Sequence, residues 1–327
     1  MVSLKVLASP GTKAGEGGTA TATLPPKETD IFDLSIFIFN SKGDVIGFTS
    51  KDFSDGNPTA VVVKTRKATG CSVYAIANAK TLNKGTSPFD GVSTLSVFKT
   101  KYLSFTDAKA PNDDNFLLMM GVSSGFDTSS ASSASPATIT LKRLASRIDY
   151  TITVKNDETT KFPIVVDSYQ LCNVPTSTFY QQSDFTNPST PSSTTFADFV
   201  KVSTPISSVA AATSSTSAGP YYVYANANTV PDPSKAKGTY LDIWAHSEVQ
   251  GAGGTKYTVW KSNFKVEMPD GKVKPNYHYK IDIVINGSVN GKNGGVITKY
   301  EAYPYFSGSI PTLNQWQSEP DRNLDLQ

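Results

Sequence analysis

Two histidines are the side chains best suited to acid–base chemistry here, and the sequence places no catalytic partner beside either one. His246 and His278 lie in alternating, strand-like stretches without a neighbouring cysteine or acidic pair. A catalytic histidine needs a nucleophile or substrate within reach and a second group that orients it. The chain also lacks a phosphate-binding loop, a Gly-x-Ser-x-Gly elbow and a His-Glu-x-x-His metal motif. We therefore predict that the protein is not an enzyme.

Metal and thiol chemistry have little support either. The acidic turn at residues 112–115 could bind a hard cation, but its spacing does not match a calcium loop, so a solvated turn is favoured. Cys71 and Cys172 lie in separate apolar stretches with no Cys or His at ligand spacing, so we expect two buried free thiols. Asn286-Gly287-Ser288 fits a glycosylation acceptor, although a turn explains it as simply. We expect no metal and no cofactor.

Two further groups of side chains could bind ligands. A basic group could bind an anion, although three charges make a weak patch and a solvated domain boundary is at least as good an explanation. Its members are Lys142, Arg143 and Arg147. An aromatic group could line a carbohydrate site, although aromatic residues are common throughout strands. Its members are Tyr221, Tyr222, Trp244 and Trp260.

Composition narrows the classes of protein that remain. The net charge is +2 with both signs interspersed, so nothing indicates a nucleic-acid partner. No run approaches the roughly 18 apolar residues of a membrane helix. Residues 1–20 also lack the features of a signal peptide. Met1 directly precedes a strand-like stretch, so we expect a mature chain with an added start methionine, whose precursor carried a targeting signal.

The elements that would position these side chains are predicted to be β-strands. Leu141 to Val154 organises the chain: from Ile148 onward apolar and polar residues alternate, as in a half-buried strand. Residues 8–29 are small and polar and predict an exposed, mobile loop. Short strands separated by turns predict an all-β fold of two antiparallel β-sandwich domains in tandem, at residues 1–140 and 141–327.

The order of several motifs resembles the fimbrillins, the type V pilins of Bacteroidales-type bacteria. The resemblance covers nearly the whole chain, and Leu141–Ile148 is similar to the signature at the family's domain junction. The other matching stretches are Ile31–Phe39 with the following Asn-Ser-Lys-Gly-Asp, Ser72–Asn78, Phe116–Met120, Tyr169–Pro175, Tyr222–Asn226 and Asn276–Ile283.

The resemblance implies two transthyretin-like sandwiches in a structural and adhesive subunit of a surface fimbria. Family precursors are lipoproteins carried to the outer membrane. A protease then removes the first strand, and a C-terminal strand of another subunit takes its place in donor-strand exchange. The implied partners are other pilin subunits, the processing protease, and a host surface or partner bacterium.

Carried onto this chain, the resemblance implies a removable strand, a cleavage site and a donor strand. The removable strand contains Val2, Leu4 and Val6. No arginine precedes Arg66, so Lys13 or Lys27 would be the cleavage site unless the strand stays. The donor segment would carry Ile310, Leu313 and Trp316, although Pro304 and Pro311 interrupt it. Two alternatives remain open: a minor tip or accessory pilin, and a monomeric, lipid-anchored module that binds carbohydrate or a host protein.

Overall fold

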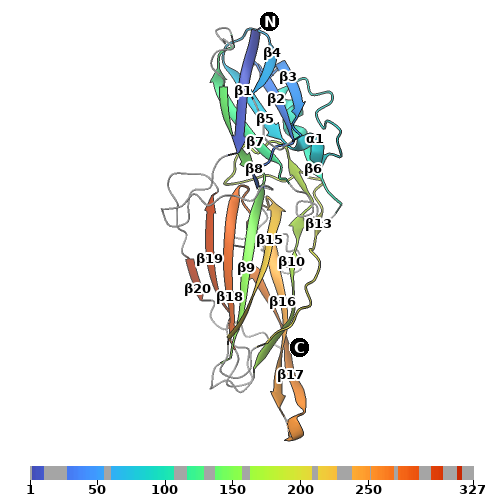
Figure 1. Cartoon of the computed structure of the whole chain (residues 1–327), viewed down its shortest axis with the longest axis vertical. Coiled ribbons are helices and arrows are strands. Elements are labelled where there is room, and N and C mark those ends of the chain that lie inside the picture. The colour runs from blue at the N-terminus through green and yellow to red at the C-terminus, as the bar shows by residue number, and fades with distance from the viewer. Residues whose placement is uncertain are drawn as a thin grey trace.

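The chain forms an elongated molecule in which β-strands dominate, as the computed structural model in Figure 1 shows. The predicted all-β fold is confirmed, and the described residues contain only short helices. The structure describes residues 2–10, 28–54, 60–106, 116–128, 137–156, 163–207, 213–226, 238–250, 252–268, 272–286, 296–304 and 315–318.

The first part of the chain folds into a closed barrel with the strand order β1-β4-β3-β2-β5-β7-β8. Alternate residues line its interior: Ile36 and Ile38 of β2 lie beside Val73 and Ala75 of β5, all fully buried. The barrel closes because β1 pairs with β4 on one side and with β8 on the other. The bounds are β1 Val2–Pro10, β2 Asp33–Phe39, β3 Val45–Asp52, β4 Val61–Thr65, β5 Cys71–Ala77, β7 Met119–Phe126 and β8 Ala137–Arg143.

A second apolar layer covers the outer face of β2 and β5. Phe37 and Phe39 alternate with the interior residues of β2, and both rings pack against Phe98. Tyr180 and Tyr222, from the second half of the chain, complete this layer and so join the two halves. Phe98 lies on the short helix α2, which begins after the N-cap residue Thr94. The bounds are α1 Ala79–Leu82, α2 Leu95–Thr100, β6 Tyr102–Ser104 and β12 Ser177–Phe179.

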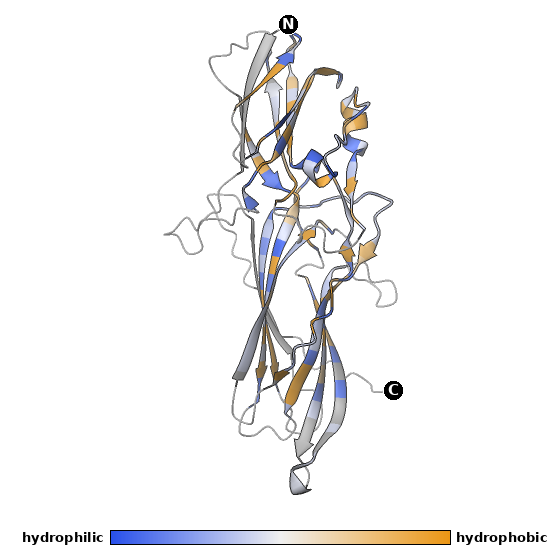
Figure 2. Ribbon diagram, turned by 45° about the vertical axis from the view of Figure 1, so that its right-hand side comes forward, coloured by the Kyte–Doolittle hydropathy of each residue, from blue (hydrophilic) through white to orange (hydrophobic). Residues whose placement is uncertain are grey.

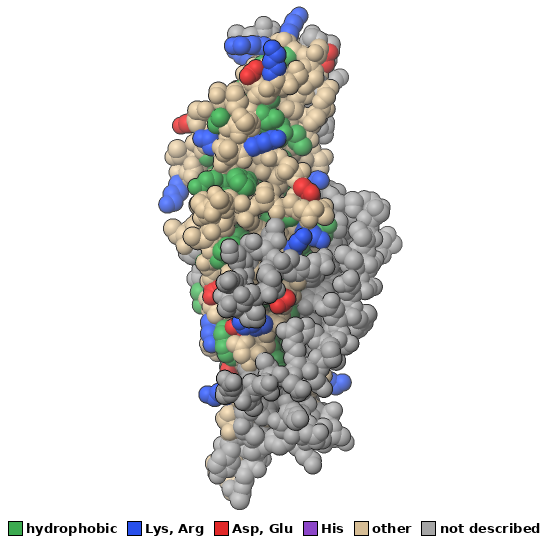
Figure 3. All heavy atoms as spheres, turned by 180° about the vertical axis from the view of Figure 1, so that it is seen from behind, with side chains coloured by type: hydrophobic (Ala, Val, Ile, Leu, Met, Phe, Trp, Pro, Cys, Tyr) green, Lys and Arg blue, Asp and Glu red, His purple; other side chains and the backbone are tan. Residues whose placement is uncertain are grey.

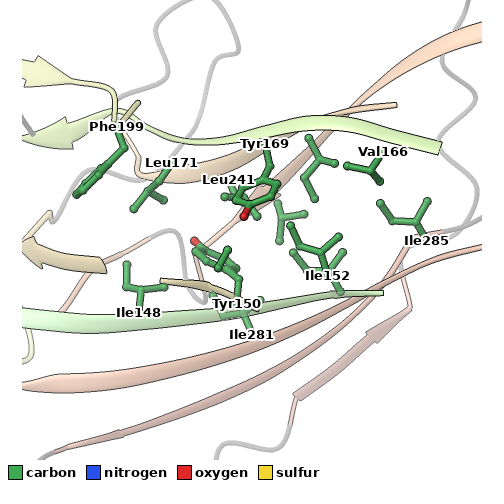
Figure 4. Close-up of a cluster of buried hydrophobic side chains, with 14 of the residues drawn as sticks. Ile148, Tyr150, Ile152, Val166, Tyr169, Leu171, Phe199, Leu241, Ile281 and Ile285 are labelled. Atoms are coloured by element: carbon green, nitrogen blue, oxygen red, sulfur yellow. The ribbon is translucent and has the colours of Figure 1, made fainter. Parts of the chain in front are cut away.

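The second part consists of two sheets packed face to face around the core drawn in Figure 4. One sheet has the order β15-β9-β18-β19-β20, and the other has the order β14-β10-β16-β17. Side chains from β9 and β18 meet those from β10 and β16, and Ile152, Ile281 and Leu241 are almost fully buried. The bounds are β9 Ala145–Lys155, β10 Ile164–Cys172, β14 Ile206–Ser207, β15 Thr213–Tyr224, β16 Tyr240–Gln250, β17 Lys256–Glu267, β18 Tyr277–Asn286, β19 Val296–Pro304 and β20 Gln315–Ser318; a small pair is formed by β11 Val174–Pro175 and β13 Phe196–Ala197.

Several stretches differ from the sequence-based prediction. Residues 8–10 were expected in an exposed loop, yet they belong to β1 and pair with β8. Leu141 to Val154 is not one strand: Leu144 separates β8, which belongs to the barrel, from β9, which belongs to the second part. The predicted domain boundary after residue 140 falls inside β8, and we propose Leu144 as the boundary. Residues 213–218 are all small and mostly polar, a composition typical of a loop, yet they begin β15 and pair with β9. Serine and threonine tolerate a strand that a neighbouring strand imposes, so composition did not reveal it.

The surface carries both signs of charge. Figure 2 shows polar and apolar residues alternating along described strands in both halves. On the face in Figure 3, lysine, arginine and acidic side chains of the described residues are interspersed, and hydrophobic side chains reach the surface at several places over the barrel. Among the described residues, no helix has the length and apolar character needed to cross a membrane.

Candidate functional site

The first strand occupies a gap between two other strands of the barrel. Its residues 2–6 run antiparallel to β4, with Leu4 opposite Val63. Its residues 6–10 run parallel to β8, with Ala8 opposite Ile139. The two pairings overlap only at Val6: the first half of β1 pairs along all of β4, and the second half pairs with residues 137–141 of β8, which closes the barrel.

The strand β8 depends on β1 for much of its ladder. The described pairing of β7 with β8 covers Met119 and Met120, opposite Arg143 and Lys142. Residues 137–141 pair instead with β1. Ile139 is 2% exposed with β1 in place, and removal of β1 would cost residues 137–141 that row of backbone hydrogen bonds.

The walls of this gap are apolar on the side that faces the barrel interior. Val61 and Val63 of β4 are buried there, and so are Ile139 and Leu141 of β8. The opposite face of β4 is exposed, since Val62 and Lys64 point to solvent. Taking β1 away would therefore uncover two unpaired backbone edges above a trough of aliphatic side chains.

The residues that the resemblance singled out lie in different places. Val2, Leu4 and Val6 are the β1 positions that pair with Thr65, Val63 and Val61, whose side chains are buried. Trp316 lies in β20 and pairs with Lys299 at the edge of the second part's larger sheet. The remaining four fall outside the described residues: Lys13, Lys27, Ile310 and Leu313.

Glu28 lies at the junction between the barrel and the second part, although the sequence predicted a mobile loop there. It is 0% exposed. Its carboxylate Oε1 accepts hydrogen bonds from Tyr222 Oη at 2.9 Å and Arg147 Nη1 at 3.2 Å. Its carbonyl oxygen accepts from Arg143 Nε at 2.8 Å. Residues of β9 and β15 thus hold the side chain of Glu28, and a residue of β8 holds its backbone carbonyl, just before β2 begins.

The two arginines therefore do not form a solvated anion patch. Arg143 is 1% exposed, and its backbone N–H donates to Asn276 Oδ1 at 3.0 Å. Arg147 also donates from Nε to Asp149 Oδ2 at 2.8 Å. Lys142, the third basic residue, stays exposed on the other face of β8, with its ammonium 5.1 Å from the ring centre of Phe185. The alternation of the strand separates these charges.

Asp149 is the second carboxylate of this junction. It lies 2.5 Å from Nε2 of His278, a residue that is 3% exposed. Partial burial alone would raise the pKa of Asp149, but the hydrogen bonds from His278 and Arg147 outweigh it and hold that pKa below its ordinary value. Asp149 is therefore a charged acceptor in the folded protein.

We expect Asp149→Asn to lower stability by about 1–3 kcal/mol at neutral pH, because it weakens two hydrogen bonds to a charged group. A depressed folded-state pKa means that the unfolded chain binds more protons, so the contribution is complete above the ordinary value of about 3.9 and is lost as the pH falls through the folded value. Denaturation at pH 7 and pH 3 checks this: the difference from wild type should shrink at pH 3. Asp282→Asn, an exposed change on β18, is the control. An equal loss at both pH values would contradict the assignment.

Both histidines have acidic partners that the sequence concealed. His246 Nδ1 lies 2.8 Å from Asp167 Oδ1, and His278 pairs with Asp149. Each pair joins strands that are far apart along the chain, so local spacing could not reveal it. The described residues contain no group of three His, Cys, Asp or Glu side chains placed to hold a metal. Cys71 and Cys172 are buried free thiols, as expected. The acidic turn at 112–115 lies outside the described residues.

Of the four aromatic residues considered for a carbohydrate site, the three with described side chains do not share one surface. Tyr221 packs inward, with its ring 4.9 Å from that of Phe199. Tyr222 lies on the opposite face of β15, buried against Glu28. Trp244 lies on β16, and the ammonium of Lys201 sits 3.6 Å from its ring centre. Trp260 lies in β17. Tyr221, Tyr222 and Trp244 therefore do not form one binding surface.

The comparisons with known proteins agree with this architecture. Residues 1–161 match the sequence model of a family described as major fimbrial subunit protein (FimA). No curated protein sequence matches the chain significantly. Among solved structures, a candidate cell adhesion protein from Parabacteroides distasonis superposes with a TM-score of 0.60 at 17% identity, covering 94% of this chain and 97% of its own.

Two solved structures from Porphyromonas gingivalis are also similar. The fimbrilin FimA of strain W83 has a TM-score of 0.53 at 14% identity, with 96% of this chain and 98% of its own covered. The tip fimbrial protein Mfa3, truncated at its C-terminus, has a TM-score of 0.53 at 13% identity, with 92% and 98% covered. At these identities the likeness is one of fold, and it extends over nearly the full length of each chain.

Proposed function

We propose that this chain, which belongs through residues 1–161 to the FimA family of major fimbrial subunit proteins, assembles into a surface fimbria by exchanging β1 for a strand of another subunit. The observation that carries the proposal is the place of β1, which fills the gap between β4 and β8 and closes the barrel. Along the chain β1 precedes the other barrel strands, so one cut between β1 and β2 would separate it from them.

The physics of a vacated strand favours this assembly. A barrel without β1 would expose unpaired N–H and C=O groups of β4 and β8 above an apolar trough. An incoming strand would restore the ladder by β-augmentation, and its alternate side chains would fill the trough. The vacated site and the incoming strand lie on different surfaces of the subunit. Such a heterologous contact propagates into a filament rather than closing on itself.

We propose the C-terminal segment with Ile310, Leu313 and Trp316 as the incoming strand. In the structure the described part of this segment, β20, is a four-residue strand at a sheet edge, paired only with β19. A short edge strand is held by few hydrogen bonds and is the easiest strand of its sheet to release. Pro304 and Pro311 remove ladder donors, so the paired portion should begin after Pro311.

Processing and location follow from the same proposal. A protease would cut after Lys13 or Lys27 and so release Val2, Leu4 and Val6 with the rest of β1. The precursor would travel as a lipoprotein to the outer membrane, and the mature subunits would form a fimbria there. Its partners would be other pilin subunits, the protease, and a host surface or partner bacterium.

A disulfide that locks β1 in place tests the proposal. Ser3 lies directly opposite Lys64, whose side chain is exposed. Directly opposed residues of an antiparallel pair have Cα atoms about 4.5–5.5 Å apart, within the range of a disulfide. We expect a Ser3→Cys/Lys64→Cys protein, cut by a lysine-specific protease, to stay monomeric when oxidised and to give a ladder of oligomers when reduced. Size-exclusion chromatography and electrophoresis measure both states.

The single variant Lys64→Cys is the matched control and should form oligomers under both conditions. Equal oligomer formation by the oxidised and reduced double variant would show that β1 need not leave. A reduced, fully trimmed protein that stays monomeric with its tail intact would also overturn the proposal.

A further inference from the structure

We propose that Glu28 sets the downstream limit of proteolytic trimming, so that the bond before Glu28 is protected and the cut falls upstream of it. The inference rests on the proposed function, because it concerns the same removal of β1. It also distinguishes the two candidate cleavage sites. Cleavage after Lys27 would break the protected bond, whereas cleavage after Lys13 would not.

A protease needs an accessible, extended stretch on both sides of the bond that it cuts. Susceptibility therefore depends on how firmly the backbone around that bond is buried and hydrogen-bonded. On the downstream side of the bond before Glu28, the first residue is 0% exposed and is held through both its carboxylate and its carbonyl oxygen. The donors come from three strands, so opening this site means parting the barrel from the second part of the chain.

The residues that follow Glu28 are held as well. The carbonyl of Asp30 accepts a hydrogen bond from Asn78 Nδ2 at 2.9 Å. Ile31 is fully buried in the barrel core. The backbone N–H of Phe32 donates to Asn78 Oδ1 at 2.8 Å. A protease that needs positions downstream of the bond in an extended groove would have to break these contacts too.

The hydrogen bonds of Glu28 would also hold the end of β8 in place after β1 is removed. Arg143 is the last residue of β8, one wall of the vacated gap, and it donates to the carbonyl of Glu28. Glu28 in turn is bonded to Arg147 and Tyr222 of the second part. Trimming upstream of Glu28 keeps these hydrogen bonds. The Arg143 end of β8 therefore retains its position for the incoming strand.

The test measures the new N-terminus rather than oligomers. The full chain is digested with a lysine-specific endoprotease under folding conditions, and the products are identified by N-terminal sequencing and intact mass. We expect the product that starts at Ala14 to accumulate at least about tenfold faster than the product that starts at Glu28. The urea-unfolded chain should be cut after Lys13 and Lys27 at similar rates.

A double variant shows whether the hydrogen bonds to the Glu28 carboxylate protect the bond between Lys27 and Glu28. Arg147→Met/Tyr222→Phe removes both side-chain donors to the Glu28 carboxylate and leaves the sequence around Lys27 unchanged. We expect the double variant to form the product that starts at Glu28 about tenfold faster than wild type. Tyr222→Phe alone is the milder change, and its rate should lie between those of wild type and the double variant. Tyr221→Phe, at the adjacent position on the other face, is the control and should behave as wild type.

Three results would overturn the inference. One is equal release of the Ala14 and Glu28 products from the folded wild type. Another is resistance of the Lys27 bond in the unfolded chain, which would place the block in the local sequence. The third is continued protection of that bond in a folded double variant. None of them depends on whether the trimmed subunits polymerise, so failure of this inference and failure of the proposed function are separable.

Discussion

Removal of β1 is expected to strip hydrogen-exchange protection from β8 while most of the barrel stays protected. Residues 137–141 pair with β1, whereas the described pairing to β7 covers only residues 142 and 143. Amides whose partners are lost exchange through local rather than global opening. The amides of β2 and β5 should keep their protection, because each strand retains a neighbour on both sides.

The expected change is large. Exchange at residues 137–141 and at the β4 positions opposite β1 should speed up by about two orders of magnitude or more, since several backbone hydrogen bonds of about 1 kcal/mol each disappear together. Amide exchange followed by mass spectrometry on trimmed monomer, held monomeric by deletion of residues 305–327, measures this. Full-length untrimmed chain is the control. Unchanged protection in β8 after trimming would mean that side-chain packing alone holds the strand.

Asn78→Ala is expected to be among the most damaging single substitutions in the barrel. The side chain is fully buried and ties together three segments, bonding Phe32 N at 2.8 Å, the carbonyl of Asp30 at 2.9 Å and the carbonyl of Leu117 at 2.8 Å. Its backbone has a φ of 66°, in the left-handed region that asparagine tolerates better than alanine.

Removing three hydrogen bonds to the backbone, one buried and two partly buried, and adding backbone strain should lower stability by roughly 3–5 kcal/mol. Denaturant unfolding followed by amide exchange in β2 and β5 reports the barrel itself. Asn78→Gly should recover about 1 kcal/mol of the loss, because glycine adopts the left-handed conformation freely. Asn83→Ala, which removes one exposed turn contact to Thr86, is the matched control and should lose under about 1 kcal/mol. Equal losses for Asn78→Ala and Asn83→Ala would contradict the role given to Asn78.

Strands with a clean alternation could be predicted from the sequence because their signal is local. In β9, buried Ile148, Tyr150, Ile152 and Val154 alternate with half-buried neighbours, as their residue types indicate. In β16, Leu241 and Ile243 face the core. Each of these strands lies between two partners in its sheet, so a period of two was enough to place it.

Features that depend on distant partners could not be predicted. Glu28 looked like part of a loop, yet its donors lie 115 to 194 residues further along the chain. Asp149 and His278 are 129 residues apart, and they meet because β9 and β18 run parallel in one sheet. The place of β1 between β4 and β8 is a property of the topology, and the sequence predicted the strand without its two neighbours.

The most direct test of strand exchange measures amide hydrogen exchange in β8 in three states of the protein: untrimmed chain, trimmed monomer and trimmed polymer. If another subunit's strand takes the place of β1, residues 137–141 should be protected in the first state, exposed in the second and protected again in the third. The β4 positions that pair with β1 should follow the same course. A polymer in which residues 137–141 remain exposed would contradict strand exchange at this gap, and the subunits would then be joined through another surface.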